Sequence, residues 1–431
     1  MKEQIDERLL NLEISPTLAI NEKCKELKEQ GKEVHKLGLG ESPFPVPESV
    51  VRSLQLNARV NNYLPVKGLH ELRKAVAEFH NKRDQIKVQA DNVLIGPGSK
   101  ELLFILQLAF NGEIILASPY WVSYESQANL LGKKIHKIET NLSDNWSVNP
   151  KLLAEIAEKD AKGRNLLFIL NYPGNPSGTT YTKDQLRKIA ETARKHNIII
   201  LSDEIYGQLS HKDEHVSIAR FYPEGTIISS GLSKWCSAGG WRLGTFLFPQ
   251  QLFPLMKAMS TVASETFSSV SSPIQHAAIT AFKGNQKIKD YLIHTNRIFY
   301  SLGNECAEKL SDAGIKVNPP EGGFYLFIDF SYFKDGLEEK KVTNSKELCA
   351  RILEETGVAI LPGSVFGRPE QELTARLAYV DFDGVKALEE SYKVSLDQEL
   401  PVDFTKQFCA KVVTAVDKII EWLTKIEMRG T

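Results

Sequence analysis

Short apolar segments alternate with amphipathic segments along the middle of the chain, from about residue 93 to residue 248. Between two apolar segments, residues 183–197 place Leu186, Ile189, Ala190 and Ala193 at helical spacing, on one face of a predicted helix. The apolar segments themselves are β-branched or aliphatic and predict strands at 92–96, 113–118, 165–171, 197–203, 225–230 and 243–248. Near-continuous apolar strands separated by amphipathic helices are typical of an α/β fold, in which a mostly parallel sheet is covered by helices on both faces.

The two ends of the chain follow a different pattern. Residues 314–330 and 374–382 predict strands of a smaller α+β lobe, with helices at 345–357 and near the C-terminus. A further helix is predicted at 17–31. The charged stretch "FKDGLEEKKVTNS" (333–345) predicts a solvated loop.

These patterns divide the chain into three parts. We expect an N-terminal arm that joins the small domain over residues 1–42, a large domain over 43–303 and a C-terminal small domain over 304–431.

Composition narrows the class of protein. A net charge of -1 over 431 residues gives no electrostatic footprint for nucleic acid or for an anionic membrane. The five cysteines are scattered without a Cys-x-x-Cys pair, which argues against a disulfide framework or a zinc site and fits a reducing compartment. The N-terminal segment has no apolar core of a signal peptide, and no apolar run is long enough to span a bilayer. We therefore expect a cytoplasmic protein.

Five polar or glycine-rich motifs follow predicted strands: "GPGSK", "SPYW", "NYPGNPSG", "SDEIYG" and "SSGLSK". Because the carboxyl ends of parallel strands meet at one edge of a sheet, we expect these motifs to form one site. Each motif also has a simpler explanation. The main-chain N–H groups of Gly98, Ser99 and Lys100 could bind a phosphate at a helix start, or the glycines could form an ordinary turn.

Each of the other candidate residues also has both a ligand-binding and a purely structural explanation. Asp203 could face a cationic ring nitrogen or cap a helix, with Tyr206 beside the same ligand if the turn is helical. Asn175 could aim its amide inward or serve a tight turn, and Trp121 could stack on a ring or lie in the core.

Three cations complete the set. Arg242 could clamp a phosphate or form a salt bridge, and Arg376, on a predicted strand of the small lobe, could bind a substrate carboxylate. Lys234 follows the apolar run "TIISS", where a lysine amine can become a nucleophile. Taken together, these groups match a flat ring that carries a phosphate, a phenolic oxygen, a basic nitrogen and an aldehyde. That ligand is pyridoxal 5'-phosphate, with Lys234 as its Schiff-base lysine.

The chain resembles the class I aminotransferases, the fold-type-I enzymes of the aspartate aminotransferase family, because three motifs occur in that family's order and spacing: "NYPGNPSGT", "SDEIYG" and "LSKWCSAGGWRLG". The resemblance is to the bacterial branch of the family and extends from residue 15 to residue 380. The resemblance implies a large domain with a seven-stranded, mostly parallel sheet and a smaller α+β domain. It also implies the role of each residue. Lys234 would form the Schiff base and move the proton, Asp203 would hold the pyridine nitrogen protonated, and Asn175 and Tyr206 would bond the phenolic oxygen.

The remaining roles follow from the same resemblance. Trp121 would stack on the ring, and Ser99, Lys100 and Arg242 would hold the phosphate. Tyr63 would reach the cofactor of a neighbouring subunit, which implies a homodimer with shared active sites. Arg376 would bind the substrate α-carboxylate and Gly40 would face it, so that Gly40, Trp121, Asn175 and Arg376 would all contact substrate.

The chain departs from the family pattern in three places. Gly231 stands three residues before the lysine, where the family usually has a Ser or Thr that donates to the phosphate; Ser230 and Ser233 are candidates to replace that donor. The stretches 333–345 and 395–408 look longer than usual and fall in the small lobe.

The resulting hypothesis is a ping-pong aminotransferase that moves an amino group between an L-amino acid and a 2-oxo acid. Aspartate with 2-oxoglutarate is the first expectation for its substrates, and aromatic or neutral amino acids come next. Two other functions stay open at this point: a PLP-dependent lyase that performs β-elimination or decarboxylation on the same fold, and a non-catalytic phosphate-binding module.

Overall fold

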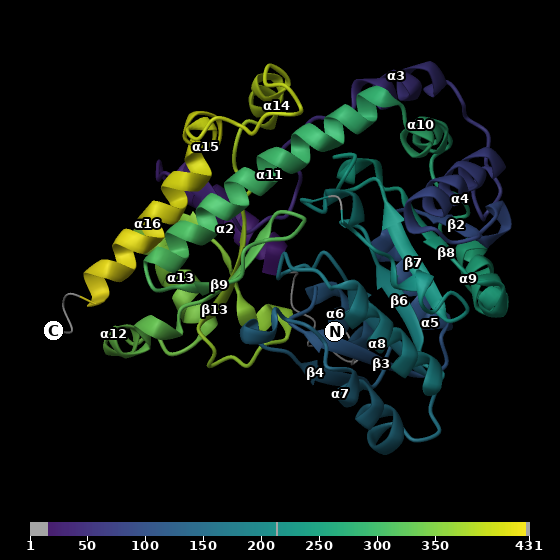
Figure 1. The fold of residues 1–431 in the computed structure, drawn as a ribbon, viewed down its shortest axis with the longest axis horizontal. Coiled ribbons are helices and arrows are strands. Elements are labelled where there is room, and N and C mark those ends of the chain that lie inside the picture. The colour runs from purple at the N-terminus through teal and green to yellow at the C-terminus, as the bar shows by residue number, and fades with distance from the viewer. Residues whose placement is uncertain (1–15, 213, 428–431) are drawn as a thin grey trace, which may run out of the picture.

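The structure is a computed structural model that describes residues 16–212 and 214–427. Its centre is a seven-stranded sheet with strand order β2-β8-β7-β6-β5-β3-β4 (Figure 1). Only β8 runs antiparallel to its neighbours, so the predicted α/β fold with a mostly parallel sheet is confirmed. The strands are β2 (Val93–Gly96), β3 (Glu113–Ser118), β4 (Ile135–Glu139), β5 (Leu166–Asn171), β6 (Ile199–Asp203), β7 (Thr226–Gly231) and β8 (Gly244–Leu247).

The sequence predicted all of these strands except β4. This edge strand alternates half-buried or buried isoleucine and histidine with exposed Lys137 and Glu139, so it lacks the continuous apolar run of the inner strands.

Helices cover both faces of the sheet. On one face the apolar side chains of the strands pack against α5 (Ser99–Ala109), α6 (Val122–Leu130) and α9 (Phe253–Glu265). On the other face they pack against α7 (Pro150–Glu155) and α8 (Lys183–Lys195), whose predicted apolar stripe is fully buried. Alternate residues of β5 supply the two cores, as the twofold period of a strand requires.

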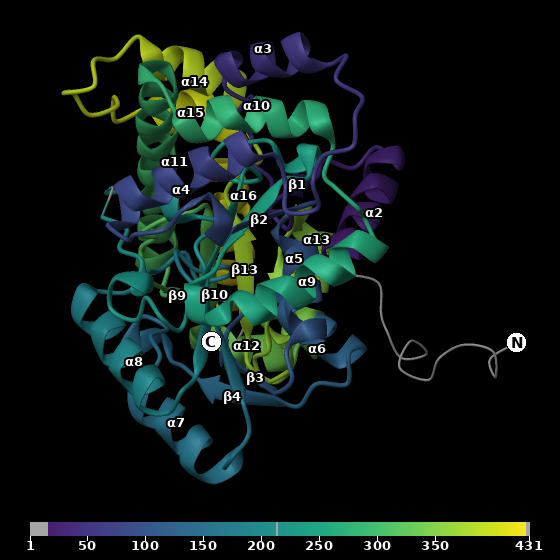
Figure 2. The same ribbon diagram turned by 90° about the vertical axis from the view of Figure 1, so that its right-hand side faces the viewer.

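Three more helices gather at one end of the large domain (Figure 2). There α10 (Ser272–Lys283) contacts both α3 (Glu48–Asn57) and α4 (His70–Asp84). From this end α11 (Gln286–Asp312) runs across the molecule to the small domain (Figure 1). The expected boundary between residues 303 and 304 falls inside α11.

The small domain is built on a four-stranded sheet with order β12-β13-β10-β9. The N-terminal part of the chain joins it, because β1 (His35–Lys36) pairs in parallel with β11 (Val358–Ala359). Residues 1–15 of the expected N-terminal arm lie outside the described residues. The strands of the sheet are β9 (Lys316–Val317), β10 (Tyr325–Asp329), β12 (Leu361–Pro362) and β13 (Thr374–Ala378), and the helices around it are α2 (Pro16–Glu29), α13 (Ser345–Thr356), α14 (Gly384–Tyr392), α15 (Phe404–Phe408) and α16 (Ala410–Glu427).

The prediction of a solvated loop at 333–345 is wrong. Residues Lys334–Glu339 form α12, which contacts α16. Leu337 and Val342 are fully buried, while the charged residues between them point outward. Phe333 is buried as well, so all three apolar residues of the segment anchor it, and the surrounding charges concealed that pattern in the sequence.

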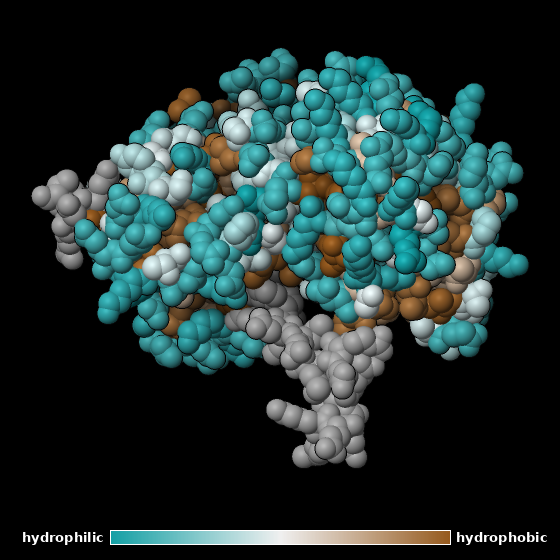
Figure 3. Space-filling model, turned by 90° about the horizontal axis from the view of Figure 1, so that it is seen from below, coloured by the Kyte–Doolittle hydropathy of each residue, from teal (hydrophilic) through white to brown (hydrophobic). Residues whose placement is uncertain are grey.

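Three features of the structure bear on the expectations drawn from composition: the hydropathy of the surface, the character of the helices and the state of the cysteines. The face drawn in Figure 3 is mainly hydrophilic with small hydrophobic areas between the polar side chains. Within residues 16–212 and 214–427, no helix combines the length and the apolar character that a membrane crossing requires. All five cysteines lie in the described part of the chain, where they are buried and form no disulfide.

Replacing Leu337 by alanine tests the packing of α12. We expect L337A to lower the free energy of unfolding by about 2–5 kcal/mol, because the change leaves a cavity against α16. Urea unfolding followed by circular dichroism measures the effect. The control E339A, at an exposed position of the same helix, should change stability by less than about 0.5 kcal/mol. Equal effects of the two variants would contradict the buried anchor.

Candidate active site

A cavity of about 410 Å³ lies at the carboxyl ends of β5, β6 and β7, and Arg376 and Tyr325 of the small domain also line it. All the predicted site residues line it except Gly98 and Tyr63. Segments far apart in the sequence thus meet in one place, which is what strand ends at one edge of a parallel sheet predict.

Asp203, the last residue of β6, is buried in the wall of this cavity. Its carboxylate accepts hydrogen bonds from the hydroxyls of Tyr124 (2.7 Å) and Ser229 (3.1 Å). Within the described residues no Lys or Arg nitrogen pairs with it. Burial raises the pKa of Asp203 above its ordinary value, although the two hydroxyls oppose the shift. The simpler explanation of a helix cap fails, since the short 3₁₀ turn that follows begins only at Gly207.

Lys234 lies three residues after β7, in a half-buried position. Its ammonium donates a hydrogen bond to the carbonyl of Gly40 (2.6 Å) and lies 5.6 Å from the ring centroids of Tyr206 and Phe324. Among the residues that the structure describes, no carboxylate lies within ion-pair distance of it. The amine is therefore positioned by neutral groups, which leave it available for chemistry.

Gly40, whose carbonyl accepts the hydrogen bond from Lys234, lies against the side chain of Tyr325. A side chain there would collide with the hydroxyl of Tyr325, since a Cβ on Gly40 would lie only 1.8 Å from that oxygen. Tyr325 Oη in turn shares a hydrogen bond of 2.9 Å with Tyr206 Oη. Glycine at position 40 thus lets the main-chain carbonyl reach Lys234 without displacing the tyrosine pair.

Arg376, on β13, is the second buried charge of the cavity. It donates to Asn175 Oδ1 (2.9 Å) and to the carbonyl of Gly38 (2.6 Å), and its Nε has no hydrogen-bond partner. No carboxylate in the described part of the chain pairs with it, and desolvation lowers its pKa. A buried guanidinium bonded only to neutral oxygens is suited to bind a carboxylate from a ligand.

The start of α5 forms the predicted anion cradle. Gly98 has a φ of 89° and precedes the helix, and a Cβ at this position would lie 2.4 Å from Nη2 of Arg242. Lys100 lies beside them, with its ammonium 5.2 Å from the ring of Trp121. Desolvation lowers the pKa of Lys100, and the positive charges of Arg242 and Lys234 lower it further. This repulsion between cations favours a bound anion.

The structure explains the unusual Gly231. It pairs with Gly244 across β7 and β8, and a Cβ on Gly231 would lie 2.7 Å from the carbonyl of Leu243. A Cβ on Gly244 would lie 2.2 Å from the main-chain nitrogen of Ser99. Gly231 thus lets β8 lie close to β7, and Gly244 lets the backbone at the start of α5 lie close to β8. Of the two candidate replacement donors, Ser233 lines the cavity.

Tyr63 is the predicted site residue that the structure places both outside the cavity and in solvent. Its side chain is 92% exposed, and it lies outside the cavity. Two tyrosines of the cavity wall, Tyr124 and Tyr325, were not predicted from the sequence. Tyr124 lies three residues after Trp121, a spacing that places both at one end of α6 and could have drawn attention to it.

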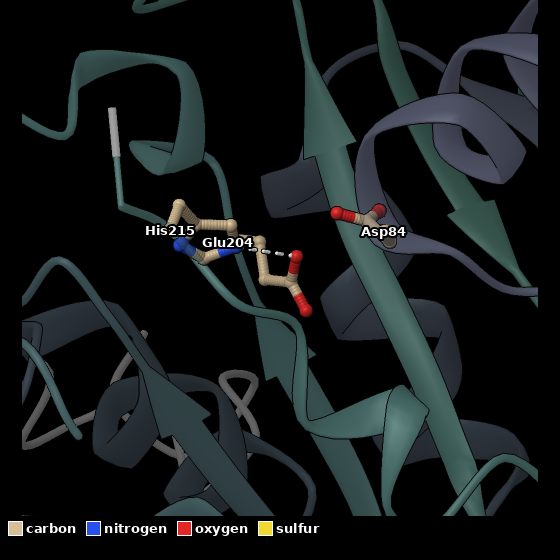
Figure 4. A group of neighbouring side chains, drawn as sticks. All are labelled: Asp84, Glu204 and His215. Carbon is tan, nitrogen blue, oxygen red and sulfur yellow. Dashed lines mark hydrogen bonds and ion pairs between the residues drawn. The ribbon is translucent and has the colours of Figure 1, made fainter. Parts of the chain in front are cut away.

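A second group of acidic and histidine side chains lies next to Asp203. Asp84, Glu204 and His215 approach one another closely enough to suggest a metal site (Figure 4). However, Nη2 of Arg83 lies 2.9 Å from Asp84 Oδ2 and 2.7 Å from Glu204 Oε2. Desolvation and Asp84 raise the pKa of Glu204, but His215 and Arg83 outweigh them and lower it. The guanidinium thus takes the place that a metal ion would need.

Comparison with known proteins identifies the family. A family model described as aminotransferase class I and II matches residues 32–386. The chain belongs to this family. An aspartate aminotransferase of Bacillus sp. (strain YM-2) is 34% identical over 88% of this chain and 95% of its own length. An asparagine–oxo-acid transaminase of Streptococcus mutans is 33% identical over 87% and 94%.

A solved structure agrees with this family. The aspartate aminotransferase of Thermus thermophilus with maleate superposes on 97% of this chain and 99% of its own, with a TM-score of 0.81 and 26% identity. The aminotransferase uses pyridoxal 5'-phosphate. The cavity fits that cofactor: Asp203 lacks a cation that a protonated ring nitrogen would supply, and the cations beside α5 lack an anion that the phosphate would supply.

Replacing Asp203 by asparagine should separate stability from activity in this aminotransferase. In the cofactor-free protein, the raised pKa means that ionised Asp203 destabilises the fold at pH values above that pKa. We expect D203N to keep or raise the Tm at pH 8, by roughly 1–3 °C. The difference should shrink as the pH falls through the raised pKa, because Asp203 then becomes neutral. Calorimetry of the cofactor-free protein measures both effects.

The same variant should lose at least about a hundredfold in kcat, since asparagine cannot hold the ring nitrogen protonated. S229A is the matched control, because it removes one neutral hydrogen bond to the same carboxylate. A D203N enzyme with nearly full activity would contradict the role of Asp203.

Replacing Arg376 by lysine tests carboxylate binding. Lysine keeps the charge but cannot offer two parallel N–H donors, so we expect the KM for the amino acid to rise about 10–100-fold with a smaller change in kcat. Steady-state kinetics measure the changes in KM and in kcat separately. R187K, on the exposed face of α8, serves as control. A KM within about twofold of the parent value would exclude Arg376 as the carboxylate ligand.

Proposed function

We propose that this aminotransferase moves the amino group of L-aspartate to 2-oxoglutarate by a ping-pong mechanism in a homodimer. The substrate class is inferred from Arg376, whose buried guanidinium has no carboxylate partner among the described residues. Arg376 lines the same cavity as Lys234. An α-carboxylate is the anion that such a group binds with two hydrogen bonds.

Lys234 has two tasks in this mechanism. Its Nζ would hold the cofactor covalently, and once free it would accept the proton from the substrate Cα and deliver it to the former aldehyde carbon of the cofactor. In the cofactor-free chain Nζ donates to the carbonyl of Gly40 at 2.6 Å, which holds the amine inside the cavity. Bound pyridoxal 5'-phosphate supplies the aldehyde and the conjugated ring that stabilises negative charge at Cα.

The other residues hold the reacting groups in place. Asp203 keeps a proton on the ring nitrogen, and Tyr124 and Ser229 fix the orientation of its carboxylate. Asn175 bonds to Arg376, so the amide that serves the phenolic oxygen also positions the guanidinium. Tyr206 bonds to Tyr325, which joins the large domain to the small domain next to Lys234. Trp121 lines the cavity beside the ring position.

Aspartate as donor is supported by the relatives, several of which are named aspartate aminotransferases. The lyase function is not favoured, because these relatives are transaminases by name.

The homodimer is supported by Tyr63, whose exposed phenol has no role in its own cavity. A second subunit would give it a phosphate to bind. The reduced, buried cysteines support our inference of a reducing compartment such as the cytoplasm.

Absorbance spectroscopy of the purified enzyme tests the proposed reaction. The holoenzyme should show a visible band that L-aspartate shifts to shorter wavelength and that 2-oxoglutarate restores. The variant K234A should lose at least about 10⁴-fold in kcat while still binding the cofactor. Asparagine, aromatic and neutral amino acids, added singly, identify another donor if aspartate fails to shift the band. Appreciable turnover by K234A would contradict the assignment of the lysine.

Mixing variants tests the shared active site. A dimer of one K234A subunit and one Y63F subunit contains one site with both natural residues. Activity that rises when the two inactive or weakened variants are mixed supports the homodimer, and unchanged activity contradicts it.

A further inference from the structure

A second and larger cavity, of about 960 Å³, lies among α4, α10, α11 and residues of the stretch 207–212 together with His215. We call it the cationic cleft. It shares no lining residue with the active-site cavity. Its volume is at the upper end of the range for small-molecule sites.

The cationic cleft carries positive charge that nearby carboxylates do not neutralise. Four exposed lysines line it, and in the described part of the chain none of them lies within ion-pair distance of a carboxylate: Lys82, Lys212, Lys283 and Lys289. Arg220, within residues 16–212 and 214–427, donates to the main-chain carbonyls of Arg83 and Asp84 and to no carboxylate. Glu78, the one acidic residue among the described lining residues, is paired with Lys74 (3.9 Å). Such a surface attracts a small molecule with several negative charges.

One wall of the cationic cleft is apolar and aromatic. Phe79 is half-buried and stacks on Trp235 with an angle of 13° between the rings, and Phe282 meets it edge-on. Ile293, which is 44% exposed, continues the wall from α11. A flat ring can pack on such a surface, so the cleft suits a molecule that combines an aromatic group with a polyanion.

Several polar atoms in the wall have no hydrogen-bond partner among the described residues. They include the indole Nε1 of Trp235, a residue only 2% exposed, together with Nη1 of Arg83, Nδ1 of His215 and Oδ1 of Asn296. Native proteins leave few buried polar groups unpaired, so their concentration beside one cleft calls for an explanation. These atoms are closed off from solvent, so a ligand in the cleft would reach them by displacing the side chains that cover them.

The same wall is the back of the active site. Trp235 directly follows Lys234, and Gly207 directly follows Tyr206. Arg83 holds Glu204 (2.7 Å), which directly follows Asp203. A ligand that moves these side chains therefore acts on the main chain of three active-site residues.

We propose that the cationic cleft is a regulatory site for a nucleoside polyphosphate. The phosphates contact the lysines, and the base packs on Phe79 and Ile293. Binding alters the positions of Lys234, Tyr206 and Asp203 through the neighbours named above, and so changes the kinetic constants of transamination.

Isothermal titration of the holoenzyme with ATP, at about 0.15 M salt, tests the site. Charge reversal in the double variant K212E/K289E should weaken binding at least about tenfold, since both lysines face the cleft. The control K188E, at an exposed position without an ion pair on α8, should bind within about twofold of the parent. Saturating ATP should change the KM for the amino acid at least about twofold in the parent enzyme and in K188E, but not in the double variant.

Two further measurements distinguish the contribution of the nucleoside ring to binding from that of the phosphate charges. Inorganic triphosphate should bind at least about tenfold more weakly than ATP, and the variant F79A should weaken ATP while leaving triphosphate unchanged. Absence of ATP binding at about 1 mM would overturn the proposal. So would equal affinity for triphosphate, binding that the double variant retains, competition between ATP and the 2-oxo acid, or binding without any change in kinetics.

Discussion

A buried carboxylate and a buried guanidinium share one cavity, and neither has an oppositely charged partner among the described residues. Removing an ion from water costs several kcal/mol even in a relaxed protein interior. Asp203 offsets part of that cost through two hydroxyl hydrogen bonds, and Arg376 through an amide and a carbonyl. The rest of the structure holds these two groups in position until ligands of opposite charge arrive.

The two charges belong to different parts of the chain. Asp203 ends a central strand of the large domain, where β5 and β7 fix it on both sides. Arg376 comes from the small domain and is bonded to Asn175 of the large domain and to Gly38 of the N-terminal segment. The guanidinium thus joins three segments at the cavity. A movement of the small domain that carried Arg376 away from Asn175 would change the charge balance of the site.

The sequence was most informative where one physical cause dominated. Continuous apolar runs predicted six of the seven strands of the central sheet, and the polar or glycine-rich motifs after them predicted residues that the structure brings to one cavity. Edge strand β4 was not predicted, because Lys137 and Glu139 face solvent and interrupt its apolar pattern. Helix α12 was not predicted, because its charged residues concealed the apolar Leu337. The resemblance supplied individual roles. Contacts such as Tyr124 with Asp203, 79 residues apart, depend on packing that no local pattern encodes.

The close contact between Gly231, Gly244 and the start of α5 constrains how this protein can change during evolution. A serine or threonine at position 231 would collide with the carbonyl of Leu243, and a side chain at 244 would collide with Ser99. A residue with a hydroxyl at position 231 would require β7 and β8 to move apart, so the order in which substitutions occur matters at this point of the active site.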